Sequence, residues 1–121
     1  MGDFRELMVY KRAYEMAMNV FKCSQQFPKH ESYSLTDQIR RSSRAVCALL
    51  AEAFRRKSYP SYFRNKIMEA DGENSETGVW LDFAKDCGYL NDEDYHSLKI
   101  LNNETGSLIG AILRNPEKYR N

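Results

Sequence analysis

Eight basic residues in one stretch of the chain are the side chains best suited to chemistry. They are Arg40, Arg41, Arg44, Arg55, Arg56, Lys57, Arg64 and Lys66. An arginine guanidinium is a planar fork of N–H donors that matches phosphate oxygens and also stacks on nucleobases. Tyr59, Tyr62 and Phe63 closely follow the run Arg55-Arg56-Lys57, and basic residues interleaved with aromatic ones suit RNA. The stretch therefore predicts a non-catalytic nucleic-acid-binding surface, with RNA as the expected ligand.

The distribution of charge along the chain leaves a second interpretation open. Residues 35–66 carry eight Lys or Arg against two Asp or Glu, whereas residues 67–100 carry two against nine. The net charge of +1 by itself points to no partner. Neighbouring helices of opposite charge attract each other, so the arginines can instead pair with acidic residues of the same or an adjacent subunit. In that case the protein is a scaffold that recruits a protein partner.

The sequence lacks the patterns that catalysis and metal binding require. His30 and His96 are the two histidines, and neither lies in a recognisable nucleophile setting. Glu69, Glu73 and Glu76 share a helical face, but a di-iron bundle needs Glu-x-x-His pairs on facing helices, and one match occurs. A glycine-rich phosphate loop is also missing. We therefore expect no enzyme activity, no metal and no cofactor.

Three cysteines and the pattern of apolar residues indicate in which compartment of the cell the protein is located. Cys23, Cys47 and Cys87 lie within apolar helical patterns and lack the spacing of metal ligands, which favours reduced thiols. The N-terminus has no secretory segment, and the chain has no apolar run of about 18 residues that could span a membrane. We expect a cytoplasmic protein without a membrane partner.

Four helices should position the basic residues, because apolar residues recur at helical spacing over about 8–26, 35–57, 59–87 and 92–114. On the second of these, a stripe is formed by Leu35, Ile39, Val46, Leu50 and Ala53, with arginines on the other side. No segment alternates with the period of a strand. We therefore predict that residues 1–121 form a single all-α domain, an antiparallel up-down-up-down four-helix bundle.

Local signals predict where three of these helices begin or end. Ser34, with Asp37 three residues later, resembles a capping box at the start of the second helix. Gly88 is suited to a C-terminal cap for the third helix. Asn91, followed by three carboxylates, predicts the start of the fourth helix.

The third helix has an unusual composition. Asn74 falls in its apolar seam, and Gly72 and Gly78 each lower its helicity by about 1 kcal/mol relative to alanine. Either close helix approach over the glycines or packing by another subunit must compensate. Trp80 and Phe83 lie partly off the seam. They either wrap under the fourth helix or form an oligomer interface, where both residue types are favoured anchors.

Short blocks of residues spread over almost the whole chain match a known pattern. They are Phe4, Leu7, Val9, Lys11, Ala13, Phe27, Pro28, Tyr33, Leu35, Thr36, Gln38, Ile39, Arg40, Arg41, Ala51, Glu52, Ala70, Gly72, Glu76, Gly88, Tyr89 and Leu90. With these residues the sequence resembles the four-helix-bundle proteins encoded in intervening sequences of bacterial 23S rRNA genes. It is also similar to the related accessory variability determinant proteins of diversity-generating retroelements.

The resemblance implies a homo-oligomer, a ring-like homopentamer, without catalytic residues. The retroelement relatives bind nucleic acid and a reverse transcriptase through a basic surface, so rRNA and a reverse transcriptase are the partners that the resemblance implies. Cys47, Leu49 and Ala53 stand where the family usually has proline, asparagine and glycine. Without that proline and glycine we expect a straighter and stiffer second helix.

Overall fold

The computed structural model describes residues 3–121, which form helices and no strand. The four long helices are α1 (Met8–Ser24), α2 (Leu35–Arg55), α3 (Pro60–Asp86) and α4 (Asp92–Arg114). Three short helices accompany them: η1 (Phe4–Glu6), η2 (Lys29–Glu31) and α5 (Pro116–Arg120). None of the helices in the described part of the chain is both long and apolar enough to cross a membrane.

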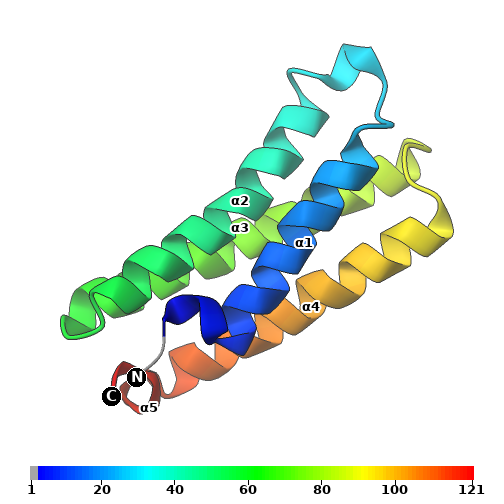
Figure 1. The fold of residues 1–121 in the computed structure, drawn as a ribbon. Coiled ribbons are helices and arrows are strands. Elements are labelled where there is room, and N and C mark those ends of the chain that lie inside the picture. Colours follow the sequence, from blue (N-terminus) through cyan, green and yellow to red (C-terminus); the bar gives the residue numbers. More distant parts are fainter. Residues whose placement is uncertain (1–2) are drawn as a thin grey trace.

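The four long helices form an antiparallel bundle (Figure 1). Each packs against its neighbour in sequence, and α4 closes the ring by packing against α1. The short connections force consecutive helices to run in opposite directions. This arrangement confirms the predicted up-down-up-down four-helix bundle.

One hydrophobic core runs along the axis of the bundle, with buried side chains from all four long helices. The five apolar residues predicted to share a stripe on α2 are all buried, and Val46, Leu50 and Ala53 are completely inaccessible. Full burial of an aliphatic side chain the size of Leu50 stabilises the fold by roughly 1.5–3 kcal/mol. α2 runs unbroken from Leu35 to Arg55.

Two of the three predicted helix ends are confirmed. Gly88 adopts a left-handed φ of +79°, and the next residue, Tyr89, donates its N–H to the carbonyl of Ala84 at 2.8 Å. Glycine adopts this backbone conformation without a steric penalty, which lets α3 end there. At the start of α4, the Asn91 side-chain oxygen accepts the N–H of Asp94 at 2.7 Å.

The predicted cap of α2 is wrong, because Ser34 does not cap this helix. Its hydroxyl donates instead to the Glu31 carboxylate, and that carboxylate accepts the Leu35 N–H at 3.2 Å. Glu31 therefore caps the helix from the short helix η2. The Ser34 hydrogen bond is the largest of the effects that hold the pKa of Glu31 below its ordinary value.

A pair of buried asparagines joins α3 to α4. The Asn102 amide donates to the Asn74 backbone carbonyl at 2.8 Å, and the Asn74 amide donates to the Asn102 carbonyl at 3.0 Å. Gly78 and Gly106 lie against the pair: a Cβ on Gly78 would come within 2.7 Å of Asn102 Oδ1, and one on Gly106 within 3.2 Å of Asn74 Nδ2. Because both glycines lack a Cβ, the two asparagine amides fit between α3 and α4. This explains how the apolar seam of α3 can contain a polar residue.

The C-terminal segment folds back onto the loop between α2 and α3. Arg120 Nε donates to the carbonyl of Lys57 at 2.7 Å, and Nη2 donates to the carbonyl of Ser58 at 3.3 Å. The N- and C-terminal segments and the α2–α3 loop therefore lie at the same end of the bundle (Figure 1). The sequence interpretation did not include α5.

Candidate nucleic-acid interface

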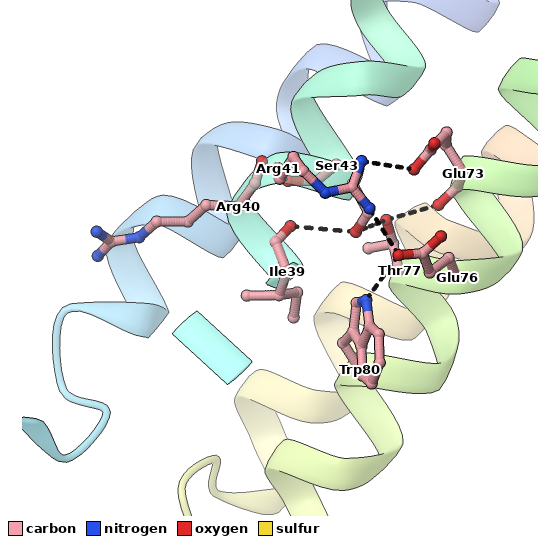
Figure 2. A network of polar contacts seen from close by, with 9 residues as sticks. Ile39, Arg40, Arg41, Ser43, Glu73, Glu76, Thr77 and Trp80 are labelled. Atoms are coloured by element: carbon pink, nitrogen blue, oxygen red, sulfur yellow. Dashed lines mark hydrogen bonds and ion pairs between the residues drawn. The ribbon is translucent and has the colours of Figure 1, made fainter. Parts of the chain in front are cut away.

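The predicted basic residues on α2 project from two sides of the helix. Figure 2 shows Arg40 and Arg41 pointing in opposite directions, with Arg41 directed towards α3. Arg55 lies fifteen residues after Arg40, which corresponds to about 22 Å along the helix axis. The eight predicted residues therefore do not form one continuous site.

Arg41 is held in ion pairs with α3. Its Nη2 atom lies 2.7 Å from Glu76 Oε1, and its Nη1 atom lies 3.5 Å from Glu73 Oε1. The indole N–H of Trp80 donates to the same Glu76 oxygen at 3.3 Å, as Figure 2 shows. Half-exposed pairs of this kind contribute roughly 0.2–1 kcal/mol each. Arg41 therefore pairs within the chain, as the scaffold interpretation requires.

Arg40 and Arg44 share one aromatic ring on α1. Their guanidinium carbons lie 4.9 Å and 5.8 Å from the centroid of Phe21. Arg40 Nε also donates to the hydroxyl of Ser24 at 2.7 Å. Neither arginine has a carboxylate within 4.0 Å in residues 3–121. The ring and the hydroxyl fix Arg40 while most of its N–H donors remain available to an anion.

An open depression of about 460 Å³ lies beside these arginines. Its lining combines three arginines, two hydroxyls and one carboxylate, from Ser32, Thr36, Asp37, Arg40, Arg41 and Arg44. Guanidinium and hydroxyl groups donate hydrogen bonds to phosphate oxygens, whereas the carboxylate repels an anion. With the balance of charge positive, the depression can accept one phosphate group.

The second group of basic residues surrounds the C-terminal end of α2. Arg55 and Arg56 are exposed, and the Arg56 guanidinium lies 5.8 Å from the ring centroid of Tyr62. Arg64 Nη1 donates to the carbonyl of Leu113 at 3.1 Å. Lys57 is half-buried. α2 ends at Arg55 rather than at 57 as expected, because Arg56 leaves the helical conformation with φ −119° and ψ 38°.

Lys66, the last of the predicted basic residues, is paired with acidic residues. Its Nζ atom lies 3.3 Å from Glu52 and 3.6 Å from Glu69. The hydrogen bond to Glu52 is the main cause of the raised pKa of Lys66. Like Arg41, Lys66 is held by carboxylates of its own chain.

Trp80 and Phe83, the predicted oligomer interface, lie on one side of α3. Trp80 is half-buried, and its ring centroid lies 6.0 Å from that of Phe83. Phe83 is 54% exposed, and Val79 beside it is 48% exposed. Phe83 is therefore not covered by α4. An apolar face of α3 remains open on the single chain.

No group of three or more His, Cys, Asp or Glu in the described residues is arranged to hold a metal ion. His96 is exposed, and His30 Nε2 lies 3.3 Å from the hydroxyl of Tyr89. Glu73 and Glu76 face Arg41, as described above.

Four basic residues near the interface were missed by sequence reasoning: Arg5, Arg114, Lys118 and Arg120. The last three belong to the C-terminal part of the chain, where Arg120 bonds the carbonyls of Lys57 and Ser58 just after α2. Pro116 at the start of α5 was an available signal, because proline is favoured in the first turn of a helix. The approach of α5 to the α2–α3 loop has no local signal in the sequence.

Fold and site together define an antiparallel four-helix-bundle protein with unpaired arginines at two places along its second helix. A family model described as 23S rRNA-intervening sequence protein matches residues 5–111. The chain belongs to this family of 23S rRNA-intervening sequence proteins, as the resemblance indicated.

A solved structure shows the same fold. It is the crystal structure of a protein with unknown function from the S23 ribosomal protein family of Bacteroides thetaiotaomicron, with a TM-score of 0.80. The two chains are 24% identical, and the alignment covers 88% of this chain and 96% of that one. A search of curated proteins finds no match to this sequence.

Proposed function

We propose that the protein binds RNA without catalysing a reaction, through the arginines that its own carboxylates leave unpaired. The proposal rests on a difference among the eight predicted basic residues, namely whether a carboxylate of the same chain lies close enough to pair with each. Arg41 and Lys66 pair with acidic residues, whereas the other six have no carboxylate within 4.0 Å in residues 3–121. Unpaired surface arginines attract phosphates, and membership of the 23S rRNA-intervening sequence protein family makes RNA the ligand to test first.

The test compares two double variants that remove the same formal charge. Arg40→Ala/Arg44→Ala removes two unpaired arginines, whereas Arg12→Ala/Lys66→Ala removes two basic residues that pair with carboxylates and lie outside the depression. Binding of a labelled 23S rRNA fragment is followed by fluorescence anisotropy between about 50 and about 200 mM salt.

The first double variant should bind at least about tenfold more weakly, because two charge-assisted contacts are lost. Its plot of log affinity against log salt should also be shallower by about 1.4, since each contact with single-stranded RNA contributes about 0.7. The paired control should bind like the wild type. No binding at low salt, or an equal loss in the control, would contradict the proposal.

Self-association of the chain through α3 is the second part of the proposal. Met68, Val79 and Phe83 are each about half exposed and lie on one helical face, where burial against a second copy would stabilise an oligomer. We expect light scattering to give the mass of an oligomer, five copies according to the family resemblance. Phe83→Glu should dissociate it, while Tyr33→Glu, which alters an aromatic residue that is 97% exposed at one end of the bundle, should not. A monomeric wild type at high concentration would refute this part.

A protein-interaction scaffold is the second candidate function. The ion pairs of Arg41 with Glu73 and Glu76 favour it, because they neutralise part of the basic surface within one chain. The two functions differ in their response to RNA. A scaffold should show no salt-dependent RNA binding, even at about 50 mM salt.

A further inference from the structure

We propose that the end of the bundle at which α2 ends and α3 begins binds single-stranded RNA, with Tyr59 stacking on a base. This basic end comprises residues 3–7, 54–64 and 113–121. The inference rests on the proposed function, because it states which form of RNA binds and at which end of the molecule. Arginines around Tyr59 supply the phosphate contacts.

Charge is divided between the two ends of the bundle. The basic end carries eight Lys or Arg against three Asp or Glu. The opposite end, residues 24–37 and 82–95, carries two Lys or Arg against seven Asp or Glu. The basic end therefore attracts a polyanion, although the chain as a whole is close to neutral.

Contacts between distant segments assemble the basic end. Arg120 bonds the carbonyls of Lys57 and Ser58, and Arg64 bonds the carbonyl of Leu113. These bonds hold the C-terminal segment against the α2–α3 loop and the start of α3. They place Arg114 and Lys118 at the same end as Arg55 and Arg56. Both Arg114 and Lys118 are exposed, and neither has a carboxylate within 4.0 Å in the described residues.

Tyr59 is an open aromatic surface at this basic end. It directly precedes α3, and 60% of its surface is exposed. The nearby Tyr62 is half-buried and already contacts Arg56 and Lys66, whereas Tyr59 takes part in none of the ring pairs or cation–π contacts of residues 3–121. An exposed ring flanked by basic residues is how proteins stack unpaired bases.

The exposed ring favours single strands over duplexes. The bases of double-stranded RNA are stacked inside the helix, so they cannot lie on Tyr59 without unpairing. A single strand can place a base on the ring and its phosphates on the surrounding arginines. The basic end should therefore bind single-stranded RNA more tightly than a duplex of equal length.

The experiment measures anisotropy with a labelled single strand of about 12 nucleotides and with the matching duplex. Tyr59→Ala removes the stacking surface, and Tyr59→Phe keeps it. Tyr33→Ala is the matched control, because Tyr33 is an exposed tyrosine at the opposite end. Arg114→Ala is paired with Lys29→Ala, which removes one exposed charge from that opposite end. Thermal unfolding checks that each variant folds.

Tyr59→Ala should bind the single strand about tenfold more weakly, whereas Tyr59→Phe should bind like the wild type. Arg114→Ala should lower the salt dependence by about 0.7, and Lys29→Ala and Tyr33→Ala should change neither quantity. RNA binding that is equally weakened by Tyr33→Ala, or insensitive to Tyr59→Ala, would overturn the inference and leave the proposed function standing. Absence of RNA binding at low salt would overturn both.

Discussion

Alanine at three glycines of the α3–α4 pair should have three different effects on stability. Gly72 has open space where its Cβ would lie, whereas the Cβ of Gly106 would lie 3.2 Å from Asn74 Nδ2 and that of Gly78 2.7 Å from Asn102 Oδ1. Each replacement gains about 1 kcal/mol of helix propensity. The difference between them therefore comes from the neighbouring amide.

The size of each effect follows from these distances. Gly72→Ala meets nothing and should raise the free energy of unfolding by about 1 kcal/mol. Gly106→Ala requires a small shift of Asn74, which should cancel most of that gain. Gly78→Ala must displace an amide that donates to Asn74 at 2.8 Å and 3.1 Å. Loss of a buried hydrogen bond costs about 1–3 kcal/mol and overpacking a similar amount, so this variant should be about 2 kcal/mol less stable than the wild type.

Urea unfolding followed by circular dichroism, at one fixed protein concentration, measures these differences. Between Gly72→Ala and Gly78→Ala we expect about 3 kcal/mol, which corresponds to roughly 10 °C or more in melting temperature. In a protein that already carries Asn102→Ala, Gly78→Ala should raise the free energy of unfolding, because the added Cβ no longer meets Asn102 Oδ1. Equal stability of Gly72→Ala and Gly78→Ala would refute the reasoning.

Four further predictions concern three single side chains. The buried Thr105 hydroxyl has no hydrogen-bond partner in the described residues, so Thr105→Val should raise the free energy of unfolding in urea by about 1 kcal/mol; a loss of stability would contradict this. Asn91→Ala removes the cap of α4 and should lower the same quantity by about 1 kcal/mol, whereas an unchanged value would mean that the cap contributes nothing. Burial raises the pKa of the Cys47 thiol to about 11, so iodoacetamide near neutral pH should modify the exposed Cys87 and spare Cys47, as measured by mass spectrometry of the peptides. Because Cys47 is held protonated in the folded state, its contribution to stability should be lost as the pH rises from about 9 to about 11.

Helix positions and several helix ends were predictable because their signals are local. The apolar spacing that predicts α2, the glycine that ends α3 and the asparagine that starts α4 each act within about one helical turn. Ser34 shows the limit of such reasoning. Its capping pattern is also local, but the Ser34 hydroxyl donates to Glu31 of the preceding short helix, and Glu31 caps α2 at the Leu35 N–H instead.

The candidate site could be predicted only in part. Arginine as the phosphate-binding residue type follows from the chemistry of its side chain. Which arginines remain available depends on the partners that packing brings near. Arg40 and Arg41 are adjacent in sequence, yet Arg41 meets two glutamates of α3 and Arg40 meets Ser24 and an aromatic ring of α1.

The sequence by itself therefore determined the family, the helical bundle and the kind of side chain that could bind RNA, because patterns within a helix depend on residues a few positions apart. The tertiary structure decided which arginines are paired, why Gly78 differs from Gly72, and that the C-terminal residues join the end of α2. Each of these depends on contacts between residues 24 to 63 positions apart. Such contacts exist only after the helices have packed, because no local pattern specifies which side chains of distant segments will meet.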